Sequence, residues 1–175
     1  MHTPHRGLYV VMGVAGSGKS VIGAALARAL AIDFVEGDSY HPPENVARMA
    51  AGIPLTDDDR WGWLRALGAS LREAGDAGRG LVVSCSSLKR SYRDALRREA
   101  APHALRFIFM RGDRTLIAGR LAARRGHYMP LSLLDSQFET LQEPTADEEV
   151  WVCDIAQSPE RIVDELVARA TGTAG

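Results

Sequence analysis

The stretch from residue 13 to residue 20 reads Gly13-Val14-Ala15-Gly16-Ser17-Gly18-Lys19-Ser20 and fits the pattern G-x-x-x-x-G-K-[ST]. An apolar run, Leu8–Met12, precedes it, and a helix-compatible run over residues 21–30 follows it. A strand, a glycine-rich turn and a helix start together direct backbone N–H groups and the positive end of a helix dipole toward one point. The stretch therefore predicts a phosphate-binding loop rather than a chance turn. In such a loop Lys19 reaches the β- and γ-phosphates of a nucleotide, and the Ser20 hydroxyl binds Mg²⁺.

Length and composition indicate one ordinary globular domain. The chain has 175 residues, a formal net charge of −1 and two cysteines, Cys85 and Cys153, each within an apolar, strand-like run. A charge near zero gives no electrostatic footprint for nucleic acid, and we expect both cysteines to be buried free thiols. We predict a single domain over residues 8–171, preceded by a flexible polar tail over residues 1–7. No apolar stretch approaches the ~18 residues of a membrane span, so we expect no membrane partner and a cytoplasmic location.

Short apolar runs alternate with helix-compatible runs along the chain. The predicted strands are Leu8–Met12, Phe34–Glu36, Leu81–Cys85, Leu105–Met110 and Val150–Asp154. The predicted helices cover residues 21–30, 43–51, 56–74, 87–100, 113–125, 131–141 and 158–171. The strands are aliphatic without clear alternation, as expected when both faces of a parallel sheet are covered. The pattern predicts an α/β fold with an open parallel sheet of about five strands, helices on both faces and a small helical lid.

The phosphate-binding loop predicts a nucleotide but not a reaction. An Asn-Lys-x-Asp guanine motif is missing from the sequence, and Val21 stands where a dinucleotide-binding loop needs its last glycine. A compact phosphotransferase remains as the class that fits the length and the spacing. Such an enzyme needs an acceptor site beside the γ-phosphate, a Mg²⁺ site and a cationic lid that excludes water.

Two carboxylates lie at the end of the second predicted strand, at the edge of the sheet where ligands bind. Asp38 is placed to accept the proton of an acceptor hydroxyl, and Glu36 to hold a Mg²⁺-bound water. The alternative interpretation is an Asx-type turn after a strand.

Basic residues near the two following helix starts extend the candidate acceptor site. Arg60 ends an acidic stretch, Thr56-Asp57-Asp58-Asp59, and its guanidinium suits a substrate carboxylate, although acids in a first helical turn also stabilise the helix dipole. Lys89 and Arg93 are four residues apart and are predicted to share one helix face, with a solvated basic helix start as the alternative. Trp61 and Trp63 are interpreted as packing residues.

The predicted lid contains Arg120 and Arg124, which are one helical turn apart. Two guanidinium groups that close over phosphates would offset the charge of phosphoryl transfer, and Gly126 would end the helix and provide a hinge. A routine basic last turn is the alternative.

Taken together, these motifs resemble the gluconate kinase (gluconokinase) family of small P-loop kinases, which are related to shikimate kinases. The resemblance covers about residues 8–168 and rests on six segments. These are residues 12–20, Gly37-Asp38-Ser39-Tyr40-His41-Pro42, Pro54-Leu55-Thr56-Asp57-Asp58-Asp59-Arg60, residues 85–94, residues 124–129, and Gln137-Phe138-Glu139-Thr140-Leu141-Gln142-Glu143-Pro144. The first segment is common to many kinases, whereas the second, third and last segments are much more specific to this family.

The resemblance implies ATP-dependent phosphorylation of D-gluconate to 6-phospho-D-gluconate, which feeds the pentose phosphate pathway. It also implies ATP and Mg²⁺ as cofactors and a homodimer. It assigns ATP binding to residues 13–20, and the lid to Arg120 and Arg124. It assigns substrate contacts to Asp38, His41, Arg60, Lys89, Arg93, His127 and Gln137. Relatives tend to have Asp at the position of Glu36, for which a metal contact through water is expected.

Two other functions stay open on the sequence. One is a kinase for another small acceptor, such as shikimate or a nucleoside monophosphate. The other is a binding module that uses ATP as a switch. The loop over residues 156–158 is the expected place for the adenine, and Gln142, Glu143 and Pro144 are interpreted as structural.

Overall fold

The computed structural model describes residues 3–124 and 130–173 and contains a five-stranded sheet in the order β2-β3-β1-β4-β5. The strands are β1 (Leu8–Met12), β2 (Asp33–Glu36), β3 (Leu81–Ser84), β4 (Arg106–Arg111) and β5 (Trp151–Asp154). Every neighbouring pair is parallel, so the carboxyl ends of all five strands meet at one edge. The predicted parallel α/β sheet is therefore confirmed, with strand ends that differ from the sequence prediction by at most one residue.

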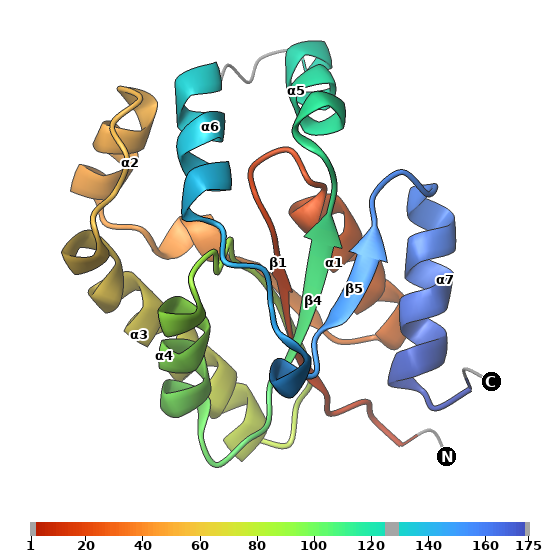
Figure 1. Ribbon diagram of the computed structural model, residues 1–175. Helices are drawn as coiled ribbons and strands as arrows, with labels where there is room; N and C mark the ends of the chain where they lie inside the picture. Colours follow the sequence, from red (N-terminus) through yellow and green to blue (C-terminus); the bar gives the residue numbers. More distant parts are fainter. Residues whose placement is uncertain (1–2, 125–129, 174–175) are drawn as a thin grey trace.

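Helices connect the strands and surround this edge. They are α1 (Lys19–Leu30), α2 (Pro43–Ala50), α3 (Asp57–Asp76), α4 (Arg90–Ala100), α5 (Arg114–Ala123), α6 (Leu131–Thr140) and α7 (Pro159–Ala170). Two short 3₁₀ helices, η1 (Gly37–Tyr40) and η2 (Ala146–Glu148), were not expected from the sequence. Figure 1 shows α2, α5 and α6 standing beyond the carboxyl ends of the strands.

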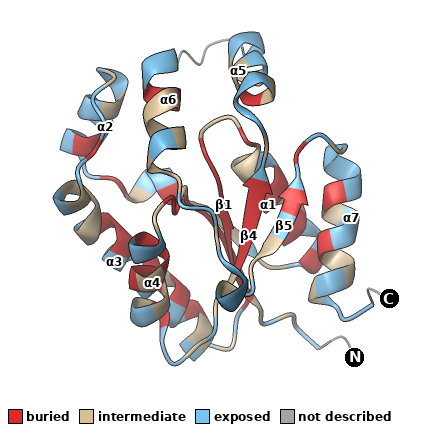
Figure 2. Ribbon diagram, in the orientation of Figure 1, coloured by how far each residue is buried: buried red, intermediate tan, exposed pale blue. Residues whose placement is uncertain are grey.

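Two hydrophobic cores hold the layers together. Leu8, Val10 and Met12 of β1 point to the face covered by α3 and α4. Tyr9 and Val11, the alternate residues, point to the face covered by α1 and α7. Strand β1 is buried along its whole length (Figure 2), because both of its faces and both of its edges are covered. This explains why its sequence is apolar without alternation.

Two helix boundaries differ from the prediction in ways that affect the site. Helix α4 begins at Arg90 rather than at residue 87, because Ser87 has a φ of 49° and Lys89 is extended (φ −97°, ψ 147°). Helix α5 ends at Ala123, and Arg124 is extended (φ −74°, ψ 122°). By contrast, α3 begins as predicted, with a capping box between Thr56 and Asp59.

Both cysteines are buried free thiols, as predicted. Burial raises the pKa of each thiol to about 11, so neither is a reactive thiolate at neutral pH. Within residues 3–124 and 130–173, no helix combines the length and the apolar character that crossing a membrane requires.

Candidate active site

The phosphate-binding loop has the conformation that its glycines predict. Gly13, Gly16 and Gly18 have φ values of 147°, 79° and 94°, which residues other than glycine rarely adopt. Gly18 caps α1, and the first turn of that helix contains no acidic residue. The N–H groups at the start of α1 and the dipole of that helix are therefore directed toward the loop, which is the arrangement that binds phosphate.

The side chain of Lys19 folds back over the phosphate-binding loop. Its Nζ donates a hydrogen bond to the carbonyl oxygen of Val14 at 3.0 Å. Burial lowers the pKa of Lys19, and the carboxylates of Asp38 and Glu36 partly oppose this effect. A partly desolvated ammonium group that has a carbonyl as its hydrogen-bond partner is well placed to receive the charge of a phosphate.

Ser20, Glu36 and Ser84 form a compact group of oxygen atoms. The Ser20 hydroxyl donates to Glu36 Oε1 at 2.5 Å, and the Ser84 hydroxyl donates to the same oxygen at 2.8 Å. Ser84 was not singled out in the sequence, but the parallel register pairs it with Glu36. A hydroxyl and a carboxylate are hard oxygen ligands that suit Mg²⁺. In the described part of the chain there is no cluster of three or more His, Cys, Asp or Glu residues that would hold a metal alone.

A cavity of about 530 Å³ lies beside the phosphate-binding loop. Six of the residues expected to act in catalysis or to bind the acceptor line it, namely Lys19, Asp38, His41, Arg60, Lys89 and Gln137. They come from α1, η1, α3, α6 and the connections after η1 and before α4, so the fold brings together residues that are up to 118 positions apart in sequence (137 − 19). Five of the seven residues predicted to bind the acceptor are thus brought together around one cavity.

Asp38 and His41 occupy the turn after β2. Gly37 precedes them because a Cβ at that position would clash with the carbonyl oxygen of Ser84. The side chain of Asp38 is 74% exposed and faces the cavity, whereas that of His41 is 2% exposed, with Nε2 3.9 Å from Asp38 Oδ1. The ring of His41 stacks on Trp63 at a centroid distance of 3.9 Å. Trp63 is therefore a packing residue of the site, in agreement with the sequence interpretation.

A charged cluster also lines the cavity. Asp57 Oδ1 accepts hydrogen bonds from Lys89 Nζ at 3.0 Å and from the Tyr92 hydroxyl at 2.5 Å. These two bonds lower the pKa of Asp57. The Arg60 guanidinium lies 5.1 Å from the centre of the Tyr92 ring, and its Nε is buried without a hydrogen-bond partner among the described residues. Asp57 and Tyr92 were not predicted as site residues, although both lie in segments that the sequence had marked.

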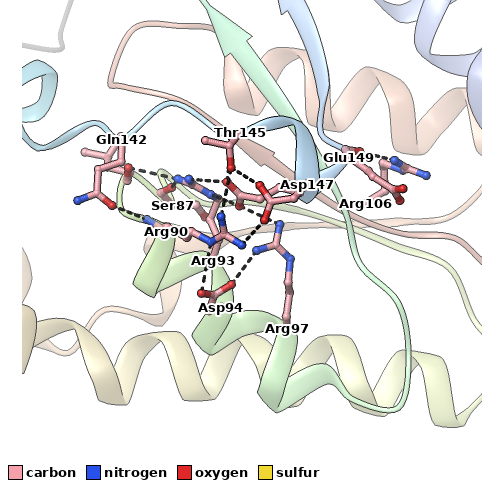
Figure 3. A network of polar contacts seen from close by, with 12 residues as sticks. Ser87, Arg90, Arg93, Asp94, Arg97, Arg106, Gln142, Thr145, Asp147 and Glu149 are labelled. Carbon is pink, nitrogen blue, oxygen red and sulfur yellow. Dashed lines mark hydrogen bonds and ion pairs between the residues drawn. The ribbon is translucent and has the colours of Figure 1, made fainter.

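Arg93 does not face the cavity, and the expectation that it shares a helix face with Lys89 is wrong. Lys89 precedes α4 and is extended, so helical spacing does not apply to the pair. The Arg93 guanidinium binds Glu148 with Nε–Oε1 and Nη2–Oε2 distances of 2.8 Å and 3.0 Å, and its side chain is 1% exposed. Figure 3 shows Arg93 within a polar network that joins α4 to the segment before β5. We therefore place Arg93 among the residues that hold the site's walls together.

Arg120 and Arg124 line a second, smaller pocket of about 270 Å³ on the other side of the loop. Gly16, Ser17, Gly18, Gln157 and Pro159 also line this pocket. Arg120 Nη2 donates to the carbonyl oxygen of Ile155 at 2.5 Å. Because Arg124 lies beyond the end of α5, the two arginines do not share a helical face as expected, yet both line the same pocket.

Gln137 connects α6 to the phosphate-binding loop. Its Oε1 accepts a hydrogen bond from the backbone N–H of Ala15 at 2.7 Å. The end of the same helix is fixed to the start of α4, since the Gln142 side chain accepts from Arg90 N at 2.9 Å and Gln142 N donates to Leu88 O at 2.7 Å. The structural interpretation of Gln142 agrees with these bonds. His127, expected to contact substrate, and Gly126, the expected hinge, lie outside the described residues.

A phosphate-binding loop at the carboxyl edge of a parallel sheet, with a polar cavity beside it, defines a P-loop kinase. Comparison with known proteins agrees: the family model described as an AAA domain matches residues 8–144. Thermoresistant gluconokinase from Escherichia coli (strain K12) is 46% identical over 161 residues, which are 91% of this chain and 91% of that protein. The crystal structure of a gluconokinase from Sinorhizobium meliloti 1021 matches with a TM-score of 0.87 and 48% identity, over 98% of this chain and 95% of that one. The chain belongs to the gluconokinase family.

Proposed function

We propose that the protein transfers the γ-phosphoryl group of ATP to the terminal hydroxyl of D-gluconate and produces 6-phospho-D-gluconate. The observation that carries this proposal is the cavity of about 530 Å³ in which Lys19, Asp38 and Arg60 all take part. It offers a phosphate-binding lysine, a carboxylate for a hydroxyl and a guanidinium for a carboxylate. The family's name supports gluconate as the acceptor.

The charges along the cavity fit a small, flexible acid with many hydroxyl groups. Arg60 and Lys89 would receive the substrate carboxylate, and the buried Nε of Arg60, which has no hydrogen-bond partner among the described residues, would gain one there. Asp57 and Gln137 are placed to bind hydroxyl groups along the chain of the substrate. The terminal hydroxyl would then lie near Asp38, on the side of the phosphate-binding loop.

In the proposed mechanism, the Asp38 carboxylate accepts the hydrogen bond of the terminal hydroxyl, orients its oxygen toward the γ-phosphorus and takes up its proton as transfer proceeds. The hydroxyl oxygen forms the new bond to phosphorus while the bond to the β-phosphate oxygen breaks, so ADP leaves. Lys19, Arg120 and Arg124 offset the negative charge on the phosphoryl oxygens. The enclosing α6 helps to exclude water, which would otherwise compete as the acceptor.

Mg²⁺ fits the Ser20, Glu36 and Ser84 oxygen group described above. Ser20 would bind the ion directly, and Glu36 would hold a water molecule bound to the ion. The hydroxyl groups of Ser20 and Ser84 already orient the Glu36 carboxylate. When bound, the ion would neutralise charge on the β- and γ-phosphates. The smaller pocket between Arg120 and Gln157 is the proposed place for the adenine, since it adjoins the glycines of the loop.

The proposal also includes features that rest on the family resemblance. They are a homodimer, a cytoplasmic location and delivery of the product to the pentose phosphate pathway.

A coupled assay of ADP release tests the proposal. The purified protein is incubated with ATP, Mg²⁺ and one acceptor at a time from a panel of sugar acids, shikimate and nucleoside monophosphates. We expect ADP release that depends on gluconate, with a new phosphate monoester at the terminal carbon detected by ³¹P and ¹³C NMR. Turnover of shikimate or of a nucleoside monophosphate, without gluconate turnover, would identify a different kinase. ATP binding with no acceptor-dependent release would instead identify a binding module.

A further inference from the structure

A chain of polar contacts leads from the backbone of α3 to Asp38. Asn45 Nδ2 lies 2.9 Å from the carbonyl oxygen of Asp59 and 3.4 Å from His41 Nδ1. On the other side of the ring, His41 Nε2 lies 3.9 Å from Asp38 Oδ1. Asn45 is 4% exposed and His41 is 9% exposed as whole residues, so solvent does not replace these partners.

The contacts determine which nitrogen of His41 carries its proton. A backbone carbonyl only accepts hydrogen bonds, so Asn45 must turn its NH₂ group toward Asp59. The second proton of the same nitrogen is then available to His41 Nδ1, which has to accept it with its lone pair. A neutral imidazole with a lone pair on Nδ1 has its proton on Nε2, the nitrogen that faces Asp38.

The neutral form of His41 is the relevant one near pH 7. Burial lowers the pKa of His41, the carboxylate of Asp38 opposes this, and the charge of Arg60 adds to the lowering. Two further contacts of the ring among the described residues are with uncharged groups, namely Asn45 at Nδ1 and the stacked indole of Trp63. Trp63 is itself held by a hydrogen bond of 2.8 Å from its Nε1 to the carbonyl oxygen of Gly37, so the ring plane is fixed as well.

The tautomer matters because the Asp38 side chain is 74% exposed and its carboxylate accepts no hydrogen bond from the described residues. An N–H on Nε2 attracts one carboxylate oxygen and leaves the other free for the acceptor hydroxyl. The opposite tautomer would place a lone pair against the carboxylate and repel it. We propose that Asn45 is a positioning residue, which orients Asp38 for phosphoryl transfer by holding His41 in its Nε2–H form. This inference rests on the role of Asp38 in the proposed function.

The first test observes the tautomer directly and needs no acceptor. Two-dimensional ¹H–¹⁵N NMR of the histidine rings, recorded at mildly alkaline pH, distinguishes the two tautomers. The loss of one signal set in His41→Gln assigns the ring. We expect His41 in the Nε2–H form in the wild type and a mixture of tautomers in Asn45→Leu. A wild-type ring that is Nδ1–H or doubly protonated would overturn the inference, even if gluconate is phosphorylated.

Kinetics test the consequence for transfer. We expect Asn45→Leu to lower kcat by at least about tenfold, because large losses of kcat occur in enzymes whose active-site histidine is held in the wrong tautomer. KM for gluconate and Kd for ATP should change little. Glu44→Gln, at the exposed neighbouring position of α2, is the matched control and should keep the wild-type kcat. An equal kcat in Asn45→Leu and Glu44→Gln would refute the role of Asn45.

A second pair of variants decides the matter if Asn45→Leu does not fold. The amide nitrogen of Gln reaches the position of Nε2, and that of Asn reaches only the position of Nδ1. His41→Gln should therefore retain most of the kcat, and His41→Asn should lose as much as His41→Leu. If Gln and Asn behave alike, the N–H at the Nε2 position is not what Asp38 requires. Failure of the proposed function appears differently, as absence of gluconate turnover in the wild type.

Discussion

Arg93 and Glu148 form a two-pronged ion pair in which the side chains are only 1% and 2% exposed. The same guanidinium donates from Nη1 to the carbonyl oxygens of Ser87 and Leu88, at 2.9 Å and 3.3 Å. One side chain thus joins α4, the connection that leads to Lys89, and the segment before β5 (Figure 3). The pair therefore supports the segment that carries Lys89, which lines the acceptor cavity. Arg93 and Glu148 do not line the cavity themselves.

Replacing Arg93 by Met should lower the free energy of unfolding by about 3 kcal/mol, because the buried carboxylate of Glu148 then loses one of its two positively charged partners. Arg97, which lies 3.0 Å from Glu148 Oε1, remains as the other partner. Urea unfolding followed by circular dichroism measures the change. Arg98→Met, on an exposed position of the same helix, is the control and should stay within about 0.5 kcal/mol of the wild type. Equal stability of the two variants would show that the pair contributes nothing.

Acid should unfold the protein partly through Glu148. Burial alone would raise the pKa of this carboxyl, but hydrogen bonds and charge from Arg93, with Arg97, outweigh it and lower the pKa from 4.5 to about 2. Because the folded-state pKa lies below the unfolded one, the stabilisation is complete above about pH 4.5 and is lost as pH falls toward 2. Urea midpoints measured across this range should therefore fall less steeply in Glu148→Gln than in the wild type. The exposed Glu139→Gln should follow the wild-type curve, and parallel curves for Glu148→Gln would contradict the assignment.

The phosphate-binding loop and the parallel sheet were predictable because both depend on local patterns. Glycines that need a positive φ, and strands buried on both faces, leave a signature within a few residues. The position of Asp38, Arg60 and Lys89 beside the phosphate-binding loop was also predictable. These residues follow strands or lie near helix starts, and the carboxyl ends of parallel strands meet at one edge.

The misplaced residues depend on contacts that local patterns do not contain. The side chain of Arg93 turns away from the cavity because of Glu148, which is 55 residues further along the chain. Likewise, Ser87 at a φ of 49° delays the start of α4, and no turn residue such as glycine or asparagine marks that position. Ser84 is brought to Glu36 only by the register of β2 and β3. The roles of His41 and Asn45 need the carbonyl oxygen of Asp59, which no sequence pattern displays.

Gln137→Glu should weaken ATP binding selectively. The substitution keeps the shape of the side chain but places a negative charge where Oε1 now lies 2.7 Å from the backbone nitrogen of Ala15, beside the expected phosphates. We expect Kd for ATP, measured by calorimetry, to rise about tenfold or more at low salt and less at high salt. Ser132→Glu adds the same charge at an exposed position of α6 and should leave Kd unchanged. A Kd for Gln137→Glu that equals the control would place the phosphates elsewhere.

Arg60→Lys should raise KM for gluconate about tenfold while KM for ATP stays unchanged. Lysine keeps the charge but loses the forked donor set, including the buried Nε that has no partner among the described residues. Arg65→Lys, on an exposed position of α3, serves as the control. Steady-state kinetics with each substrate varied in turn distinguish the two effects. An unchanged KM for gluconate would remove Arg60 from the acceptor site.

Asp38→Asn should affect turnover far more than acceptor binding. The amide has the size of the carboxylate and still accepts a hydrogen bond from a hydroxyl, so KM for gluconate should change little, but it takes up no proton. We expect kcat to fall about 10²- to 10⁴-fold, the range typical of a lost general base. Asp33→Asn, at the opposite and exposed end of β2, removes the same charge from the same segment and should keep the wild-type kcat. Near-normal turnover in Asp38→Asn would mean that the hydroxyl loses its proton late, to the phosphoryl oxygens, and that Asp38 only orients it. A large rise in KM with kcat preserved would make it a binding residue.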